Sequence, residues 1–148
     1  MFAHLLIPTD GSEIANKAVQ RGIAFAKAQG AKMTVIHVSP TFRQLTDEGY
    51  LVPGPTRGSK VWREAITERA QAILDRVAAE ATKAGVKCET THVFHNTTYA
   101  AIIATANKAG CDVIVMGSHG YGAVKGVVLG SETTRVLSHT KIPVLVIR

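Results

Sequence analysis

Hydrophobic residues along this chain of 148 residues follow two patterns that alternate from its beginning to its end. Short, almost continuous apolar runs are typical of strands buried in a parallel sheet. Longer segments between them place apolar residues three and four positions apart, which is typical of one face of an α-helix. The apolar runs predict strands at residues 3–8, 33–38, 86–94, 113–116 and 143–147.

The second pattern predicts helices at residues 12–29, 60–84, 97–109 and 131–139. Ser12 is a suitable N-cap for the first helix and Gly30 a suitable stop, because a hydroxyl accepts from early N–H groups and glycine adopts the left-handed conformation. Either Asn96 or Thr97 is expected to cap the third helix. The apolar stripe of the second helix is expected at Trp62, Ile66, Ile73, Val77 and Ala81.

Strands that alternate with helices throughout predict an α/β protein, with one domain over residues 1–148. We expect a three-layer α/β/α sandwich around a Rossmann-like, five-stranded parallel sheet of order 3-2-1-4-5. Ligands of such open sheets bind beyond the carboxyl ends of the strands, where the strand order reverses. The polar turns at residues 9–12 and 117–120 are therefore expected to face each other across one crevice.

Two segments depart from the regular alternation. Residues 86–94 alternate only in part, which is typical of a strand with one less buried face or at a sheet edge. Residues 39–59 have no clear period and contain three prolines and three glycines. A mobile surface insertion is expected there, and a lid or an interaction loop stay open as alternatives.

Glycines occupy positions 117, 120, 122, 126 and 130 after the fourth predicted strand, and Ser131 follows where the last helical pattern begins. A loop with few side chains lets backbone N–H groups approach an anion closely. A helix N-terminus beyond it adds unpaired donors and a favourable dipole. Phosphate is the expected anion, and Ser131 is expected both to cap the helix and to offer it a hydroxyl.

The composition excludes several classes of protein. Apolar residues make up 46% and charged residues 19%, as in ordinary globular proteins, and the net charge is +6. The basic residues are scattered over helical segments, which disfavours a nucleic-acid partner. Cys88 and Cys111 lie far apart and no metal-ligand spacing is present, so we expect buried thiols, a reducing compartment and no metal site. No signal-peptide core or membrane-spanning run is present, so a cytoplasmic protein without a membrane partner is expected.

The spacing Gly117-x2-Gly120-x9-Gly130-Ser131 resembles the nucleotide-binding signature of the universal stress protein family, in its ATP-binding branch. The resemblance covers nearly the whole chain. It includes the first strand with the turn at residues 8–12, the second strand that ends at Val38, the segment at residues 109–117, and the closing run at residues 141–148. A glycine pair alone would be weak evidence, whereas the spaced motif within its strand-turn-helix context is specific.

The resemblance implies an adenine nucleotide, ATP with or without Mg²⁺, and a role for each residue that matches the motif. The residues implied around the nucleoside are Pro8, Thr9, Asp10 and Val38. Those implied near the ribose and first phosphate are Met116, Gly117, His119 and Gly120. Those implied at the phosphates are Gly130, Ser131 and Thr133. Glu132 departs from ATP-binding relatives, which often have a small or apolar residue there, and its carboxylate would repel a triphosphate unless Mg²⁺ or an outward rotamer intervenes.

Structural alternatives stay open for the same side chains. Asp10 could cap the first helix, with Glu13 returning the bond. His119 could be an ordinary loop residue, and Lys125 could be solvated rather than bound to phosphate. The remaining histidines, among them His37 and His92, show no ligand spacing and are interpreted as structural or exposed.

Three functions follow from these observations. The first is a stress-response regulatory module that binds ATP or a related adenine nucleotide. The second is a slow ATP hydrolase, which is disfavoured because the GxxxxGK[ST] loop is missing. The third is a dimeric partner-binding protein without nucleotide. In each case the closing strand, at residues 143–148, is expected to pair with a second copy: Pro143 opens it, Arg148 ends it, and the family resemblance implies an antiparallel homodimer.

Overall fold

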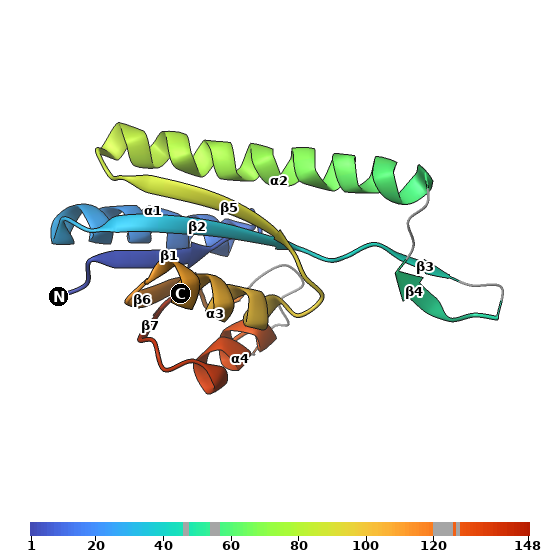
Figure 1. Ribbon diagram of the computed structural model, residues 1–148. Helices are drawn as coiled ribbons and strands as arrows, with labels where there is room; N and C mark the ends of the chain where they lie inside the picture. The colour runs from blue at the N-terminus through green and yellow to red at the C-terminus, as the bar shows by residue number, and fades with distance from the viewer. Residues whose placement is uncertain (46–47, 54–56, 120–125, 127) are drawn as a thin grey trace.

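The computed structural model describes residues 1–45, 48–53, 57–119, 126 and 128–148 (Figure 1). The main strands are β1 (His4–Pro8), β2 (Lys32–Ser39), β5 (Cys88–Phe94), β6 (Val113–Gly117) and β7 (Val144–Ile147). The helices are α1 (Glu13–Gln29), α2 (Arg57–Ala84), α3 (Thr98–Ala109) and α4 (Ser131–His139). These elements are the predicted ones, and their ends differ from the expected positions by at most three residues.

The main sheet has five parallel strands in the order β5-β2-β1-β6-β7. Numbered among themselves along the chain, these strands follow the predicted order 3-2-1-4-5. β5 lies at one edge, as its partial alternation indicated, and β7 lies at the other. The reversal of strand order falls between β1 and β6, which are neighbours.

Two helices cover each face of the sheet (Figure 1). Alternate residues of β1 point to opposite faces, so Leu5 and Ile7 belong to the core under α1 and α2, and Leu6 to the core under α3 and α4. Helix α1 approaches β1 so closely that a Cβ at Gly22 would lie 2.2 Å from Ile7 Cδ1. A larger residue at this crossing would therefore require the end of the Ile7 side chain to shift.

Most helix ends follow their predicted chemistry. Ser12 caps α1 by accepting a hydrogen bond from Ala15 N at 3.3 Å, and Gly30 ends it at a φ of 66°. Thr97, and not Asn96, is the N-cap of α3. The expectation that Ser131 caps α4 is wrong: Gly130 is the N-cap, and Ser131 is the first helical residue.

Residues 39–59 contain more regular structure than the sequence indicated. β3 (Arg43–Leu45) and β4 (Leu51–Pro53) pair as an antiparallel hairpin, which projects away from the main sheet (Figure 1). α2 then begins at Arg57 rather than at residue 60. Residues 46–47 and 54–56 lie outside the described part of the chain. Short strands of this kind have no clear apolar period, because only the partner strand stabilises them.

Only the second half of α2 packs in the core. Its buried residues in the described part are Ala70, Leu74, Val77 and Ala81. Three members of the predicted stripe, Trp62, Ile66 and Ile73, are only partly buried. The reason is length: 28 residues of helix span about 42 Å, whereas the longest strand, of eight residues, spans about 26 Å. Within the described residues, no helix has the combination of length and apolar character that crossing a bilayer requires.

Candidate functional site

The predicted crevice lies at the carboxyl ends of β1 and β6. The connection from β1 runs through α1 to β2, and the connection from β6 runs through α4 to β7, on the opposite face of the sheet. Neighbouring strands whose connections diverge in this way leave room for a ligand beyond their ends. Pro8 ends β1, and Thr9 and Asp10 follow it. Met116 and Gly117 end β6, and His119 follows shortly after, so one edge carries both predicted groups.

Hydrogen bonds to β2 and within the turn itself hold the turn after β1 in place. Thr9 donates its N–H to Ile36 O at 2.9 Å, and its own carbonyl accepts from His37 Nδ1 at 2.8 Å. The Thr9 hydroxyl oxygen accepts from Gly11 N at 3.2 Å. The turn is therefore tied to β2, and its backbone has one well-defined position beside the crevice.

Asp10 has a structural role within this turn. Its Oδ1 accepts a hydrogen bond from Ser12 N at 2.9 Å, which is a local turn of the kind that aspartate forms two residues before its donor. The alternative that Asp10 itself caps α1 is wrong, because Ser12 occupies that position. The bond to Ser12 orients the carboxylate at the mouth of the crevice.

The N-terminus of α4 is fastened to the end of β6. Thr133 donates its hydroxyl to Gly117 O at 2.9 Å, and Gly130 donates its N–H to Ser118 O at 2.6 Å. Ser118 in turn donates its N–H to Ile147 O, in β7, at 2.7 Å. Gly117 is also tightly enclosed, since a Cβ there would lie 3.2 Å from Ile14 O. The predicted phosphate residues and the end of β6 thus form one rigid unit.

The first turn of α4 is electrostatically suited to an anion. Gly130 has no side chain that could accept from the first N–H groups, and α4 has no side-chain cap bond. Helix N-termini without a cap present unpaired donors and the positive end of the dipole. The exposed Ser131 adds a hydroxyl at the same place. Backbone donors and a hydroxyl of this arrangement can bind a phosphate group.

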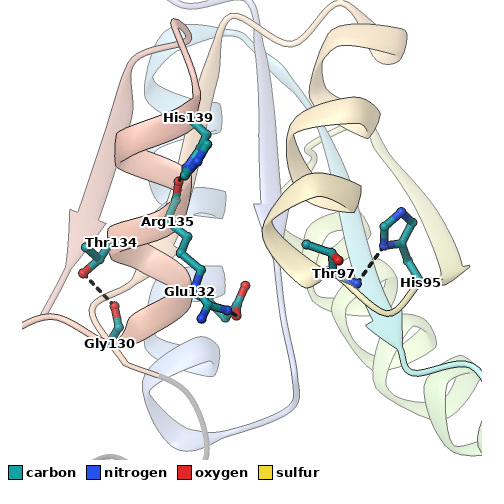
Figure 2. A network of polar contacts seen from close by, with 7 residues as sticks. All are labelled: His95, Thr97, Gly130, Glu132, Thr134, Arg135 and His139. Carbon is teal, nitrogen blue, oxygen red and sulfur yellow. Dashed lines mark hydrogen bonds and ion pairs between the residues drawn. The ribbon is translucent and has the colours of Figure 1, made fainter. Parts of the chain in front are cut away.

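Glu132 turns away from this donor set. Its Oε1 forms an ion pair with Arg135 Nη1 at 3.1 Å, one turn along α4. Figure 2 shows both side chains on the side of α4 that faces α3, with Gly130 and Thr134 on the opposite side. The second carboxylate oxygen, Oε2, is buried without a hydrogen-bond partner. The neighbouring cation therefore reduces the repulsion expected from this residue.

The remaining predicted residues are placed as follows. Met116 is only 6% exposed and packs in the core under α3 and α4, so its side chain is mainly structural. Val38 is partly buried against the same core, just beyond the strand pairing of β1 with β2. His119 Nδ1 lies 3.0 Å from Ser118 Oγ. Gly120 and Lys125 lie outside the described residues.

Two contacts at the crevice were not predicted from the sequence. His37, interpreted as structural or exposed, holds the Thr9 carbonyl. Ser118 links α4 and β7 to the end of β6 through its backbone. No local pattern could have revealed either contact, because each joins segments that are distant in the sequence.

Further features of the described residues lie outside this site. A shallow hollow lies on the exposed side of α2, lined by residues from Arg63 to Asp75, and shares no residue with the crevice. The described residues contain no group of three or more side chains that could hold a metal ion. Burial raises the pKa of both Cys88 and Cys111 to about 11, as inert thiols require, although Cys88 is only partly buried.

Comparisons with known proteins agree with this architecture. The model of the universal stress protein family matches residues 1–148. Universal stress protein MJ0531 of Methanocaldococcus jannaschii is 31% identical, over 100% of this chain and 83% of that protein. The solved structure of MJ0577 from the same organism is 28% identical, covers 99% of this chain and 96% of its own, and superposes with a TM-score of 0.83.

A further solved structure is a universal stress protein in complex with cAMP. It is 24% identical, covers 99% of this chain and 97% of its own, and has a TM-score of 0.71, so its likeness concerns the fold. The family match over the full length, the strand order and the glycine spacing agree with one another. The chain belongs to the universal stress protein family, and its Gly-x2-Gly-x9-Gly-Ser spacing is that of the family's ATP-binding branch.

Proposed function

We propose that this protein binds an adenine nucleotide, preferentially ATP, in the crevice between β1 and β6, and that it acts as a regulatory module of a cytoplasmic stress response. The proposal rests mainly on the structure of the N-terminus of α4. Its N-cap is a glycine without a side chain, and Thr133 fastens it to the Gly117 carbonyl. A preformed set of backbone donors can bind phosphate without reorganisation. The neighbour in complex with cAMP supports an adenine nucleotide as the ligand.

The residues present fit a nucleotide with several phosphates. The donors of α4 suit the phosphates, and the turn at Thr9 and Asp10 suits the nucleoside on the other side of the crevice. Mg²⁺ would be held chiefly by the phosphates, because the described residues offer no cluster of three ligands and Mg²⁺ commonly keeps several waters. The ion would neutralise phosphate charge.

Thermal unfolding with and without ATP tests the proposal. At about 100 times Kd, a ligand that binds only the native state stabilises by about 2.7 kcal/mol. For a domain of this size that corresponds to roughly 5–10 °C in Tm. ADP, AMP and cAMP, measured in the same way, establish the preference among nucleotides. Wild-type protein whose Tm does not respond to any of the four contradicts the proposal.

A substitution at Gly130 separates phosphate binding from stability. Gly130 has a φ of −70° and a ψ of 160°, which any residue adopts. In Gly130→Asp the new carboxylate would cap α4 itself and repel phosphate, so the protein should remain at least as stable while ATP stabilisation is lost. Gly130→Ala is the matched control, because its methyl group neither caps the helix nor carries charge. Asp10→Ala should also lose the ATP response.

We further propose that the protein binds ATP without turning it over efficiently. The side chains near the expected phosphates are engaged in other contacts: Glu132 with Arg135, and His119 with Ser118. Phosphoryl transfer usually needs a positioned base and a phosphate-directed lysine. Measured ATP hydrolysis should therefore stay near background, and a rate that disappears in His119→Ala would contradict this part of the proposal.

We also propose a homodimer in which two β7 strands pair across a two-fold axis. β7 lies at the sheet edge, and Leu145 is 39% exposed there. An apolar edge strand presents unpaired backbone groups that a second copy can satisfy. Val146→Lys should convert the dimer to a monomer in light scattering, with Lys87→Ala as an exposed control elsewhere. A mass that is unchanged in Val146→Lys rules out this edge.

A further inference from the structure

An aromatic cluster joins three segments at the carboxyl end of the edge strand β5. The ring of Trp62, in α2, lies 5.4 Å from that of Phe42 and 6.3 Å from that of Phe94, measured between centroids. His92 lies 4.6 Å from Phe94 on the same strand. Phe42 directly precedes the β3–β4 hairpin. The cluster therefore connects β5, α2 and the start of the hairpin.

Two histidines extend this cluster to the crevice. His37 and His92 are register partners on β2 and β5, and their ring centroids are 5.8 Å apart. His37 Nδ1 lies 2.8 Å from Thr9 O, and because a carbonyl only accepts, this nitrogen carries the hydrogen. His92 Nε2 lies 2.9 Å from Ser39 Oγ. Both rings are partly buried.

Two basic side chains face His92 from the elements packed against β5. His37 faces it from β2, and Arg63 faces it from α2, with its guanidinium 4.0 Å from the centroid of the Phe94 ring. Burial, His37 and Arg63, in that order, lower the pKa of His92 below its ordinary value. Glu64 and Glu68, on α2, line the same exposed hollow as Arg63, and Glu89 lies on β5 three residues before His92. The groups that shift the pKa of His92 include none of these carboxylates.

The start of α2 contributes little to the core. No residue from Ser59 to Arg69 is buried, and Val61 is 62% exposed. Trp62 and Arg63 contact Phe42 and Phe94 at this end of the helix. A segment with few buried apolar contacts opens at a low free energy, so a small electrostatic change can shift it.

We propose that His37 and His92 form an acid-sensitive latch. Protonation of His92 places an imidazolium group in the cluster that also contains the Arg63 guanidinium, and the cluster then opens and releases Phe42 and the first turns of α2 from β5. The latch holds at neutral and higher pH, when His92 is neutral, and opens as the pH falls through the pKa of His92. His37 connects the latch to the crevice, because its Nδ1 donates a hydrogen bond to the Thr9 carbonyl.

The chain contains one tryptophan, Trp62, and its ring packs near Phe94, which in turn contacts His92. Trp62 fluorescence of the full chain, followed from neutral to mildly acid pH without nucleotide, therefore reports latch opening independently of the proposed function. A reversible change in emission is expected below about pH 6.5, the ordinary histidine pKa. Far-UV circular dichroism should change little over this range, because the core strands and α1 stay folded. A fluorescence change that coincides with loss of the whole circular dichroism signal overturns the latch.

Three variants make the test specific. His92→Gln should abolish the acid transition of Trp62, whereas His139→Gln, an exposed histidine of α4 on the other face of the sheet, should keep it. Arg63→Gln removes a cation and should move the midpoint upward by roughly a few tenths of a pH unit. If His92→Gln does not fold, the pH midpoint of the Trp62 transition in Arg63→Gln tests the proposal by itself. An unchanged transition in His92→Gln, or an unchanged midpoint in Arg63→Gln, overturns the proposal.

Discussion

Thr133 donates its hydroxyl hydrogen bond to the carbonyl oxygen of Gly117 at 2.9 Å, so the first turn of α4 is anchored to the last residue of β6. Thr133 is 2% exposed, and neither partner has easy access to water. This bond helps to hold the helix N-terminus in place as one wall of the crevice. The nucleotide site proposed above depends on that position.

Replacing Thr133 by valine keeps the shape of the side chain and removes the hydroxyl. The Gly117 carbonyl is then buried without its partner, which should cost about 1–3 kcal/mol in the free energy of unfolding. ATP stabilisation should fall as well, because α4 is no longer fixed. Urea denaturation and ATP-dependent Tm shifts measure the two effects. Thr133→Ser, which retains the hydroxyl, should keep most of both, and a Thr133→Val protein equal to wild type would show that the bond has no such role.

The contact of Gly22 with Ile7 predicts a compensating pair. Gly22→Ala would place its methyl group 2.2 Å from Ile7 Cδ1 in a fully packed core, and overpacking of this kind typically costs about 1–3 kcal/mol. Ile7→Val removes that δ-methyl group and alone should cost about 0.5–1.5 kcal/mol. The double variant should be more stable than the sum of the two losses predicts. A double-mutant cycle by urea denaturation measures the coupling, and strict additivity would contradict the packing argument.

The ion pair of Glu132 with Arg135 predicts how this chain tolerates an acidic residue beside phosphate. Arg135→Gln leaves the carboxylate without its cation and should weaken ATP binding roughly three- to tenfold, as expected for about 1 kcal/mol of added repulsion. Glu132→Gln should bind ATP at least as well as wild type. The double variant should recover the affinity lost in Arg135→Gln. Titration calorimetry at low salt compares the four proteins, and an Arg135→Gln affinity equal to wild type would exclude this role.

Buried histidines predict that stability falls in mild acid. His4 is 5% exposed and its Nε2 lies 2.8 Å from Thr34 Oγ1. Burial, followed by the charge of Lys32, lowers the pKa of His4, so folding favours the neutral ring. Its contribution to stability is therefore complete above about pH 6.5, the pKa of an unfolded histidine, and is lost as the pH falls through the lower folded value. His4→Gln should flatten this part of the stability curve, measured by urea denaturation at several pH values, with His95→Gln as an exposed control. A curve of wild-type steepness in His4→Gln would contradict this role.

Local sequence alone determined the elements and much of their order. Strands and helices differ in the period of their apolar residues, and Gly30 and Gly110 end helices because left-handed positions at φ values of 66° and 69° favour glycine. Strand-helix alternation led to the parallel sheet, and the glycine spacing led to the family. These features can be predicted from the sequence because they depend on residues within a few positions of each other.

Only the tertiary structure decided which side chains meet. The bond from His37 to Thr9, the burial of Met116 and the turn of Glu132 toward Arg135 on the α3 side arise from how whole elements pack. The overhang of α2 likewise follows from the length of the strands beneath it. Such contacts join residues far apart in the chain, or choose among rotamers with similar local energies, so no local pattern encodes them.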